Sequence, residues 1–359
     1  MCSPILMETE AICLLPSLIH VFTTSSRLLT SPLFYTTSES HLYLIIDQIP
    51  DIRPSCPRQA VTARPAKRVE HLDPLTDDER LLATPWVRAF DLKSKKWCEV
   101  RVDELSPMTW KDEAFEKLVL PGDEKYLAWE FVEAKSLAED EEFDDFIADK
   151  GRGLIILRFG PPGVGKTFTA EAVAEKSRVP LYAMSAAELG TAPDAVEKAL
   201  ERALGLCRMW NAMLLLDEAD VFLGTRTLKS IAHNELVAIF LRMLEYYQGT
   251  MFLTTNRINS IDPAFQSRID LFLPYHDLSP KARREVWCNF IERAGKEKFD
   301  LTDPSLDKLS QVPLNGREIK NLIKSVQLLS RKSGAKISME RLYMLAESRV
   351  QALALRTGK

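Results

Sequence analysis

The sequence predicts an α/β fold in which a five-stranded parallel sheet is followed by a small helical domain. Between residues 150 and 278, short apolar runs alternate with amphipathic stretches. Strands that alternate with helices usually pair in parallel and are covered on both faces, so this order indicates a mainly parallel sheet. After residue 279 the pattern is purely helical, which predicts a separate small bundle at residues 279–352.

Five apolar runs supply the predicted strands, and in chain order they are LIILRF, PLYAMS, AMLLLD, TMFLTT and DLFLPY. The stretch TFTAEAVAEKS after the first run predicts a helix, as does NELVAIFLRMLEYY before the fourth. In DAVEKALERALGLC, four residues recur at helical spacing and predict one buried face, namely Val196, Leu200, Ala203 and Cys207.

The chain before the sheet is less regular. Residues 1–75 show no sustained period of 3.6 or 2, and we expect a poorly structured segment and linker there. Residues 52–68 contain three prolines and five basic residues, which favours a flexible linker over a nuclear-localisation signal because the charges are spread out. Residues 76–149 are expected to form a partial N-terminal or adaptor region, with a strand at EVRV and mainly helix at 113–135. The acidic stretch 138–149 is interpreted as a solvated helix face or linker.

Composition and charge exclude several classes of protein. The hydrophobic share of 46% and charged share of 27% are ordinary for a globular chain, and the formal net charge of -4 argues against a general nucleic-acid binder. The six cysteines are scattered without a CxxC pair, which is typical of reduced thiols and not of a zinc site. No run is long enough for a membrane span, and Glu8 and Glu10 argue against a secretory signal. We therefore expect an intracellular protein, cytoplasmic or nuclear.

A phosphate-binding loop is predicted at GPPGVGKT, which matches G-x-x-x-x-G-K-[ST] in full between a strand and a helix. Gly163 and Gly165 have no Cβ, so the backbone amides can turn inward around a phosphate. The positive end of the following helix points at the same anion. Lys166 is expected to reach the β- and γ-phosphates, and the Thr167 hydroxyl to ligate Mg²⁺.

A pair of carboxylates follows the strand AMLLLD. Asp217 ends the strand, where it is expected to hold Mg²⁺ directly or through water, and Glu218 can polarise a water in line with the γ-phosphate. A phosphotransferase would exclude that water, so the pair favours hydrolysis, and a small-molecule kinase is the weaker interpretation. A DEAD-box helicase is disfavoured, because the further motifs of that family have no good candidates here. Thr167 and Asp217 are thus the predicted metal ligands, and the predicted nucleotide-binding residues are Gly160, Pro161, Pro162, Gly163, Val164, Gly165, Lys166, Thr167, Phe168 and Asp217.

The order of the motifs GPPGVGKT, LLLDEAD, FLTTNR, DPAFQSRID and LNGREIKN resembles an AAA+ ATPase module. It is especially similar to a little-characterised group of fungal AAA-domain ATPases, over about residues 75 to 352. The resemblance implies a P-loop NTPase core at residues 150–278 and a helical lid at 279–352. It also implies ATP and Mg²⁺ as cofactors and self-association into a ring, with a hexamer as the expected number.

The resemblance assigns roles to three further residues. Asn256 matches the first sensor, whose amide can hold the attacking water or the γ-phosphate. Arg268 matches the arginine finger that family members insert into a neighbouring subunit's site. Arg317 resembles the second sensor, which couples nucleotide state to the angle of the lid, although a salt-bridged helix arginine is an equal alternative. The expected catalytic residues are Glu218, Asn256, Arg268 and Arg317.

Several features depart from the family's pattern, including a finger region that is shorter than the common two-arginine form. The loop SAAELGTAPDAVE lacks the aromatic that many AAA+ unfolding motors use to grip a threaded polypeptide, so we do not expect threading. Arg158 lies near the end of a buried strand, where its charge must reach a partner or solvent. Asp149 stands where a glycine would be unsurprising in this group, within residues 145–150, which are expected to border adenine.

The sequence therefore predicts Mg²⁺-dependent ATP hydrolysis that drives remodelling of a macromolecular partner whose identity these residues do not encode. The alternative is a nucleotide-dependent scaffold with little or no turnover.

Overall fold

The structure is a computed structural model that describes residues 33–37, 43–46, 86–120, 124–137, 151–226, 230–257, 260–333 and 336–357. These residues fall into two compact units, one within residues 1–109 and the other within 110–359. The predictions made for residues 52–68, 138–149 and 145–150 lie outside the described residues. In the described part of the chain, no helix combines the length and the apolar character that a membrane span requires.

The N-terminal unit contains an antiparallel sheet with the strand order β4-β3-β2-β1-β5. Strands β1 and β2 correct the expectation that residues 1–75 lack regular structure. Their sequences, LFYTT and YLII, are rich in aromatic and aliphatic residues that favour strands, but they are too short to produce a sustained period. Strand β4 confirms the strand predicted around EVRV. The elements are β1 (Leu33–Thr37), β2 (Tyr43–Ile46), β3 (Trp86–Asp91), β4 (Lys96–Arg101), η4 (Val102–Glu104) and β5 (Leu105–Pro107).

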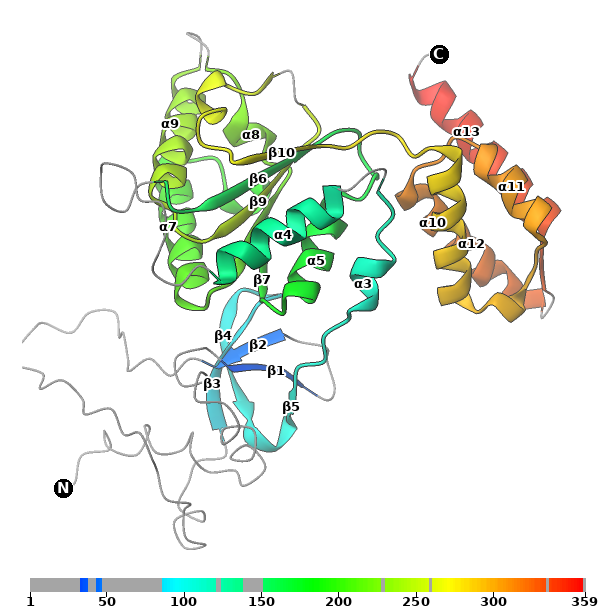
Figure 1. Cartoon of the computed structure of the whole chain (residues 1–359), viewed down its shortest axis with the longest axis horizontal. Coiled ribbons are helices and arrows are strands. Elements are labelled where there is room, and N and C mark those ends of the chain that lie inside the picture. Colours follow the sequence, from blue (N-terminus) through cyan, green and yellow to red (C-terminus); the bar gives the residue numbers. More distant parts are fainter. Residues whose placement is uncertain are drawn as a thin grey trace, which may run out of the picture. The chain divides into compact units, whose positions relative to one another are not determined.

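The second unit is built on the predicted five-stranded parallel sheet (Figure 1), with strand order β10-β6-β9-β8-β7. Strand β9 lies between β6 and β8, so the carboxyl end of β9 separates the phosphate loop after β6 from the carboxylates after β8. In parallel α/β sheets, ligands bind at these carboxyl ends. The strands are β6 (Leu154–Phe159), β7 (Leu181–Ser185), β8 (Met213–Asp217), β9 (Thr250–Thr255) and β10 (Leu271–Pro274).

Helices cover both faces of this sheet, with α4 and α5 on one side and α7 and α9 on the other (Figure 1). Alternate residues of each strand face opposite sides, as the period of two requires. Ile156 and Phe252, for example, pack in one cluster with the buried alanines of α5. Helix α7 buries the four residues predicted for its inner face, which confirms the helical period there. The helices are α3 (Glu113–Glu116), α4 (Glu124–Leu137), α5 (Lys166–Ser177), α6 (Ala186–Leu189), α7 (Pro193–Met209), α8 (Asp220–Leu223) and α9 (Ile231–Tyr246).

A helical bundle with its own core follows the sheet. Ser279 caps its first helix, because its hydroxyl accepts a hydrogen bond from the Ala282 amide at 3.2 Å, and Pro280 starts that helix. The expectation of a purely helical segment is wrong in one respect, since β11 and β12 form a short parallel pair. Two-residue strands leave no alternation in the sequence. The elements are α10 (Pro280–Ala294), η7 (Lys296–Lys298), β11 (Phe299–Asp300), α11 (Asp303–Gln311), α12 (Gly316–Ser333), β12 (Ile337–Ser338) and α13 (Met339–Thr357).

Helix α12 begins against the phosphate loop. The Glu318 amide donates to Asn315 Oδ1 and the Asn315 amide donates to Glu318 Oε2, both at 3.0 Å, which is a reciprocal capping box. The Asn315 side chain lies so close to Gly163 that a Cβ at Gly163 would be 2.6 Å from Asn315 Oδ1. Gly163 also has a φ of +79°, so glycine is required there for both reasons. The lid is therefore in direct contact with the loop that would hold phosphate.

Candidate nucleotide site

Lys166 connects the phosphate loop to the end of the neighbouring strand β9. It is the first residue of α5 and is buried. Its ammonium donates hydrogen bonds to the carbonyls of Gly160 at 2.7 Å and Pro161 at 2.6 Å, and to Asn256 Oδ1 at 2.8 Å. Two residues predicted from separate motifs, Lys166 and Asn256, are thus in contact.

The environment of Lys166 favours an anionic ligand. Burial lowers the pKa of its ammonium to about 8, although the carboxylates of Asp217 and Asp220 oppose that shift. An additional negative charge beside the ammonium would favour its protonated form. A phosphate that replaced the two loop carbonyls as partner would therefore stabilise the charged lysine.

The two predicted metal ligands also lie together. Thr167 Oγ1 is 3.0 and 3.1 Å from the two carboxylate oxygens of Asp217, to which it donates. Hydroxyl and carboxylate oxygens are hard ligands of the kind that Mg²⁺ prefers, with substrate phosphates and water completing its shell. This donor set fits Mg²⁺ at the mouth of the phosphate loop.

Glu218 follows the end of β8 and has an unusual backbone conformation. Its φ is +54°, in the left-handed region that non-glycine residues rarely adopt, and its side chain is exposed. The Glu218 amide donates to Thr254 Oγ1 at 2.9 Å. Backbone strain of this kind is held by surrounding structure and clusters at functional sites.

Three residues of the site were missed in the sequence, namely Thr254, Thr255 and Asp220. Thr254 Oγ1 donates to Asp217 Oδ1 while it accepts from the Glu218 amide, so one hydroxyl orients both residues of the carboxylate pair. Thr255 Oγ1 donates to Asp220 Oδ1, which also accepts from the Asn256 amide at 3.3 Å. The available signals were the TT before Asn256 and the second aspartate of LLLDEAD.

We predict that Thr254→Val lowers the turnover of ATP about 10- to 100-fold, because it removes the hydroxyl that orients Asp217 and Glu218. Thr254→Ser retains the hydroxyl and should preserve most of the turnover. The rate constant for phosphate release and its dependence on Mg²⁺ concentration would be measured. Thr250→Val, at the opposite end of the same strand, is the matched control. Equal activity of Thr254→Val and the unmodified protein would contradict the assignment.

Arg317 lies in the first turn of α12, next to the contact between Asn315 and Gly163, and its side chain is exposed. Its charge contributes to the lowered pKa of Lys166, after burial and the opposing carboxylates, which places it within electrostatic range of the phosphate loop. It forms no ion pair with the residues that the structure describes. No described residue therefore supplies the partner that a salt-bridged Arg317 would require.

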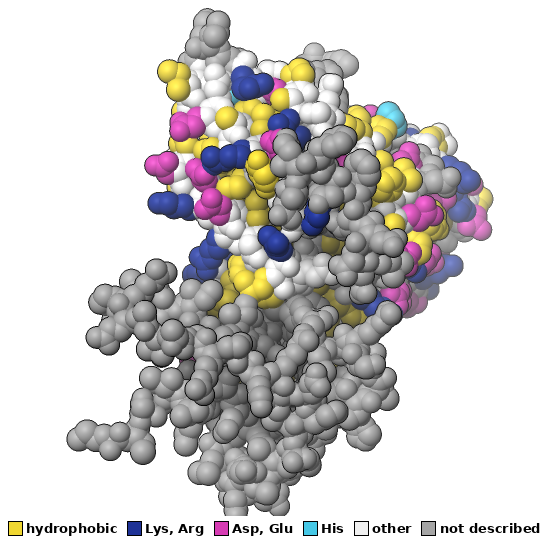
Figure 2. Space-filling model, turned by 60° about the vertical axis from the view of Figure 1, so that its left-hand side comes forward, with side chains coloured by type: hydrophobic (Ala, Val, Ile, Leu, Met, Phe, Trp, Pro, Cys, Tyr) yellow, Lys and Arg dark blue, Asp and Glu magenta, His cyan; other side chains and the backbone are white. Residues whose placement is uncertain are grey.

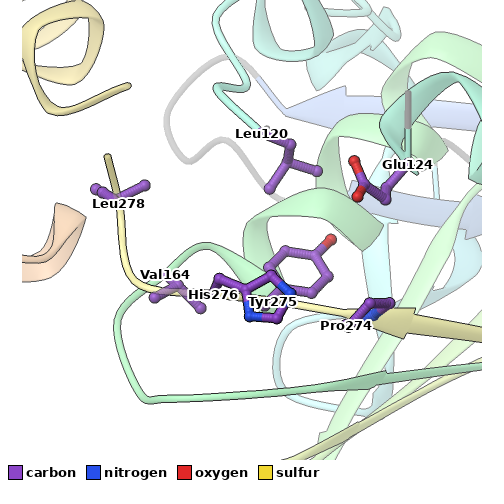
Figure 3. A pocket seen from close by; sticks show the side chains of 7 residues that line it. All are labelled: Leu120, Glu124, Val164, Pro274, Tyr275, His276 and Leu278. Atoms are coloured by element: carbon purple, nitrogen blue, oxygen red, sulfur yellow. The ribbon is translucent and has the colours of Figure 1, made fainter. Parts of the chain in front are cut away.

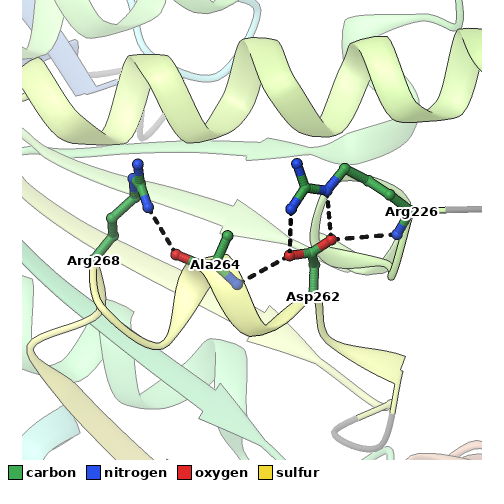
Figure 4. A network of polar contacts seen from close by, with 4 residues as sticks. All are labelled: Arg226, Asp262, Ala264 and Arg268. Carbon is green, nitrogen blue, oxygen red and sulfur yellow. Dashed lines mark hydrogen bonds and ion pairs between the residues drawn. The ribbon is translucent and has the colours of Figure 1, made fainter.

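Arg268 is bound to other residues of its own chain (Figure 4). It follows η6 (Pro263–Phe265), its Nη1 donates to the Ala264 carbonyl at 2.9 Å, and its Nη2 is 3.3 Å from Glu245 Oε2. Its Nε is buried without a hydrogen-bond partner among the described residues. On the other side of η6, Asp262 accepts from the Ala264 amide and pairs with Arg226 at 2.8 Å. This network fixes the short helix that carries Arg268.

A small hollow lies where the sheet joins the lid (Figure 3). Burial raises the pKa of the Tyr275 hydroxyl, which donates to Thr169 Oγ1 at 2.7 Å, and Thr169 in turn donates to the Gly165 carbonyl. The hinge between sheet and lid is thus hydrogen-bonded to the first turn after the phosphate loop. The hollow is lined by Leu120, Glu124, Val164, Pro274, Tyr275, His276 and Leu278.

This parallel sheet, phosphate loop, carboxylate pair and abutting lid define an AAA+ ATPase module, and residues 156–275 match the family described as "ATPase family associated with various cellular activities (AAA)". That match covers part of the chain, and the relatives described next also support a similarity to the AAA+ ATPase superfamily. It is 29% identical over 215 residues to ATP-dependent zinc metalloprotease FtsH 3 of Sphaerobacter thermophilus, covering 55% of this chain and 42% of that protein. It is also 29% identical over 194 residues to ATPase family AAA domain-containing protein FIGL1 of Arabidopsis thaliana, covering 50% of this chain and 27% of that protein.

The fold also matches a chain in the structure titled "Structure of E. coli MS115-1 HORMA:CdnC:Trip13 complex", with a TM-score of 0.51 and 18% identity. That match covers 66% of this chain and 90% of the other. The chain spans less than half the length of the two curated relatives described above.

Proposed function

We propose that this chain binds ATP and hydrolyses it with Mg²⁺, and that the cycle drives remodelling of a macromolecular partner. The observation that carries the proposal is the meeting of separately predicted residues at the carboxyl edge of one sheet. Lys166 contacts Asn256, and Thr167 contacts Asp217, which Glu218 follows directly. The match of residues 156–275 to the AAA family supports it.

Each residue has a role that its position supports. The loop 160–165 and Lys166 would hold the phosphates, and Thr167 and Asp217 would hold Mg²⁺, which neutralises phosphate charge when bound. Glu218 would accept a proton from the attacking water, and Asn256, anchored by Lys166 and Asp220, would orient that water. Arg317 would report the state of the nucleotide to the lid.

We further propose that the working form is a ring, with a hexamer as the expected number, in which Arg268 completes a neighbour's site. Residues 150–278 would be the ATPase core, 279–352 the lid and 76–149 an adaptor region. On the face shown in Figure 2, basic side chains are interspersed with acidic ones, which favours a protein partner over nucleic acid.

Phosphate release from ATP tests the hydrolysis directly. We expect phosphate release to require Mg²⁺, and the rate of release per subunit to rise with protein concentration. Release should be lost in Lys166→Ala, because that variant lacks the ammonium that holds the phosphates. ATP binding without release at any concentration would replace the proposal with the scaffold alternative. Failure to bind ATP at all would overturn both.

A further inference from the structure

A charged residue is buried beneath the phosphate loop. Arg158, in β6, has 0% of its surface exposed and is among the largest fully buried side chains of the described residues. It projects to the side of the sheet that α5 covers, and its guanidinium carbon lies 4.6 Å from the centre of the Phe252 ring. A cation stacked on an aromatic face is stabilised, but this attraction offsets only part of the cost of burying a charge.

The guanidinium has fewer partners than its charge requires. Its Nη1 donates to the carbonyl of Lys166, the residue that starts α5. Its Nε and Nη2 are buried and form no hydrogen bond of good geometry among the described residues, although the Tyr275 hydroxyl lies close enough to stabilise the charge. Burial lowers the pKa of Arg158, while the Tyr275 hydroxyl and then the Asp217 and Glu171 carboxylates oppose the shift. Arginine nonetheless stays protonated in proteins, so the charge remains and is only partly compensated.

Positive charges converge on this loop. The Arg158 guanidinium touches the backbone of Lys166, whose ammonium is on the ligand side, and Arg317 lies within electrostatic range. The amino-terminal end of α5 adds a partial positive charge at the same point. In the nucleotide-free protein these cations repel one another, and the Asp217 and Asp220 carboxylates are the negative charges that oppose this repulsion. A triphosphate bound in the loop would add further compensating negative charge.

We propose that Arg158 is a positioning residue of the phosphate loop, which fixes the first turn of α5 and whose buried charge is compensated by the phosphates of bound nucleotide. The inference rests on the proposed nucleotide binding. Arg158 would then couple the stability of the module to nucleotide binding. It destabilises the nucleotide-free module, and it strengthens binding in proportion to the negative charge of the ligand. An apolar side chain at this position would make the nucleotide-free module more stable. It would also reduce the additional stability that the module gains when nucleotide binds.

The test compares three variants of the full chain. Arg158→Met removes the charge but keeps the length, Arg158→Gln keeps a hydrogen-bond donor without the charge, and Arg158→Lys keeps the charge. Melting temperature without nucleotide and dissociation constants for Mg·ATP and Mg·ADP would be measured. We expect Arg158→Met to melt about 2–4 °C higher without nucleotide. It should bind ATP on the order of tenfold more weakly and ADP only about threefold more weakly, with Arg158→Gln similar in binding and Arg158→Lys near the unmodified protein.

Several outcomes would overturn the inference while leaving the proposed function intact. If Arg158→Met or Arg158→Gln bound ATP as tightly as the unmodified protein does, the charge of Arg158 would not contribute to ATP binding. Equal losses for ATP and ADP, with a lower melting temperature and no rescue by lysine, would assign Arg158 to packing alone. Arg242→Met, at an exposed ion pair on α9, is the control and should change neither affinity. If the unmodified protein bound neither nucleotide, the proposed function would fail together with this inference.

Discussion

Glu218→Gln is expected to lower the turnover of ATP by at least roughly a hundredfold while ATP binding remains close to that of the unmodified protein. The substitution keeps the size of the side chain and removes only its ability to accept a proton from water. Binding should persist because the contacts of the phosphate loop are made by Lys166 and not by Glu218. Phosphate release would give the turnover, and equilibrium titration with Mg·ATP would give the affinity.

Two features of the structure sharpen this test. The backbone of Glu218 is held in the left-handed region by a hydrogen bond to Thr254, so glutamine at the same position is held in the same way. Glu201→Gln, on the exposed face of α7, is the matched control for loss of one negative charge. Unchanged turnover in Glu218→Gln would remove Glu218 from the chemistry and leave the base to be sought elsewhere.

The parallel sheet could be predicted from sequence because each of its strands is an apolar run that differs visibly from its neighbours. The order of these strands could not be predicted from the runs themselves. The position of β9 between β6 and β8 is what brings Asn256 to Lys166, and it depends on pairings between residues far apart in the chain. Asn256 was therefore found through the resemblance and its contact through the structure.

The two threonines that were missed in the sequence were missed for one physical reason. Thr254 and Thr255 are β-branched, so in sequence they are indistinguishable from ordinary strand residues. Their function depends on which neighbouring strand ends in a carboxylate. For Arg158 the sequence revealed a buried charge, but its hydrogen-bond partner is the backbone carbonyl of Lys166, and a backbone atom leaves no trace in the sequence. The role of Arg158 could be argued only from the structure.

Arg268→Ala is expected to lower turnover by roughly a thousandfold, because the proposed role of its guanidinium is to stabilise charge on the phosphoryl group in a neighbouring subunit. In the isolated chain Arg268 is paired with Glu245 and the Ala264 carbonyl, so the loss could also come from disturbed packing around η6. Glu245→Gln separates the two causes, because it breaks the ion pair and leaves Arg268 in place. A catalytic Arg268 predicts that Glu245→Gln retains turnover, whereas a packing role predicts that it loses turnover as Arg268→Ala does.

Mixing the two inactive variants gives the decisive measurement. A subunit with Arg268→Ala still has Glu218, and a subunit with Glu218→Gln still has Arg268. Where a subunit that retains Glu218 receives the arginine of a neighbour that retains Arg268, the shared site is complete. Random assembly of an equal mixture makes about a quarter of such interfaces complete, so phosphate release should recover to about that fraction of the unmodified rate. Arg268 acting within its own subunit allows no recovery at any ratio, because every site then lacks either the arginine or the glutamate.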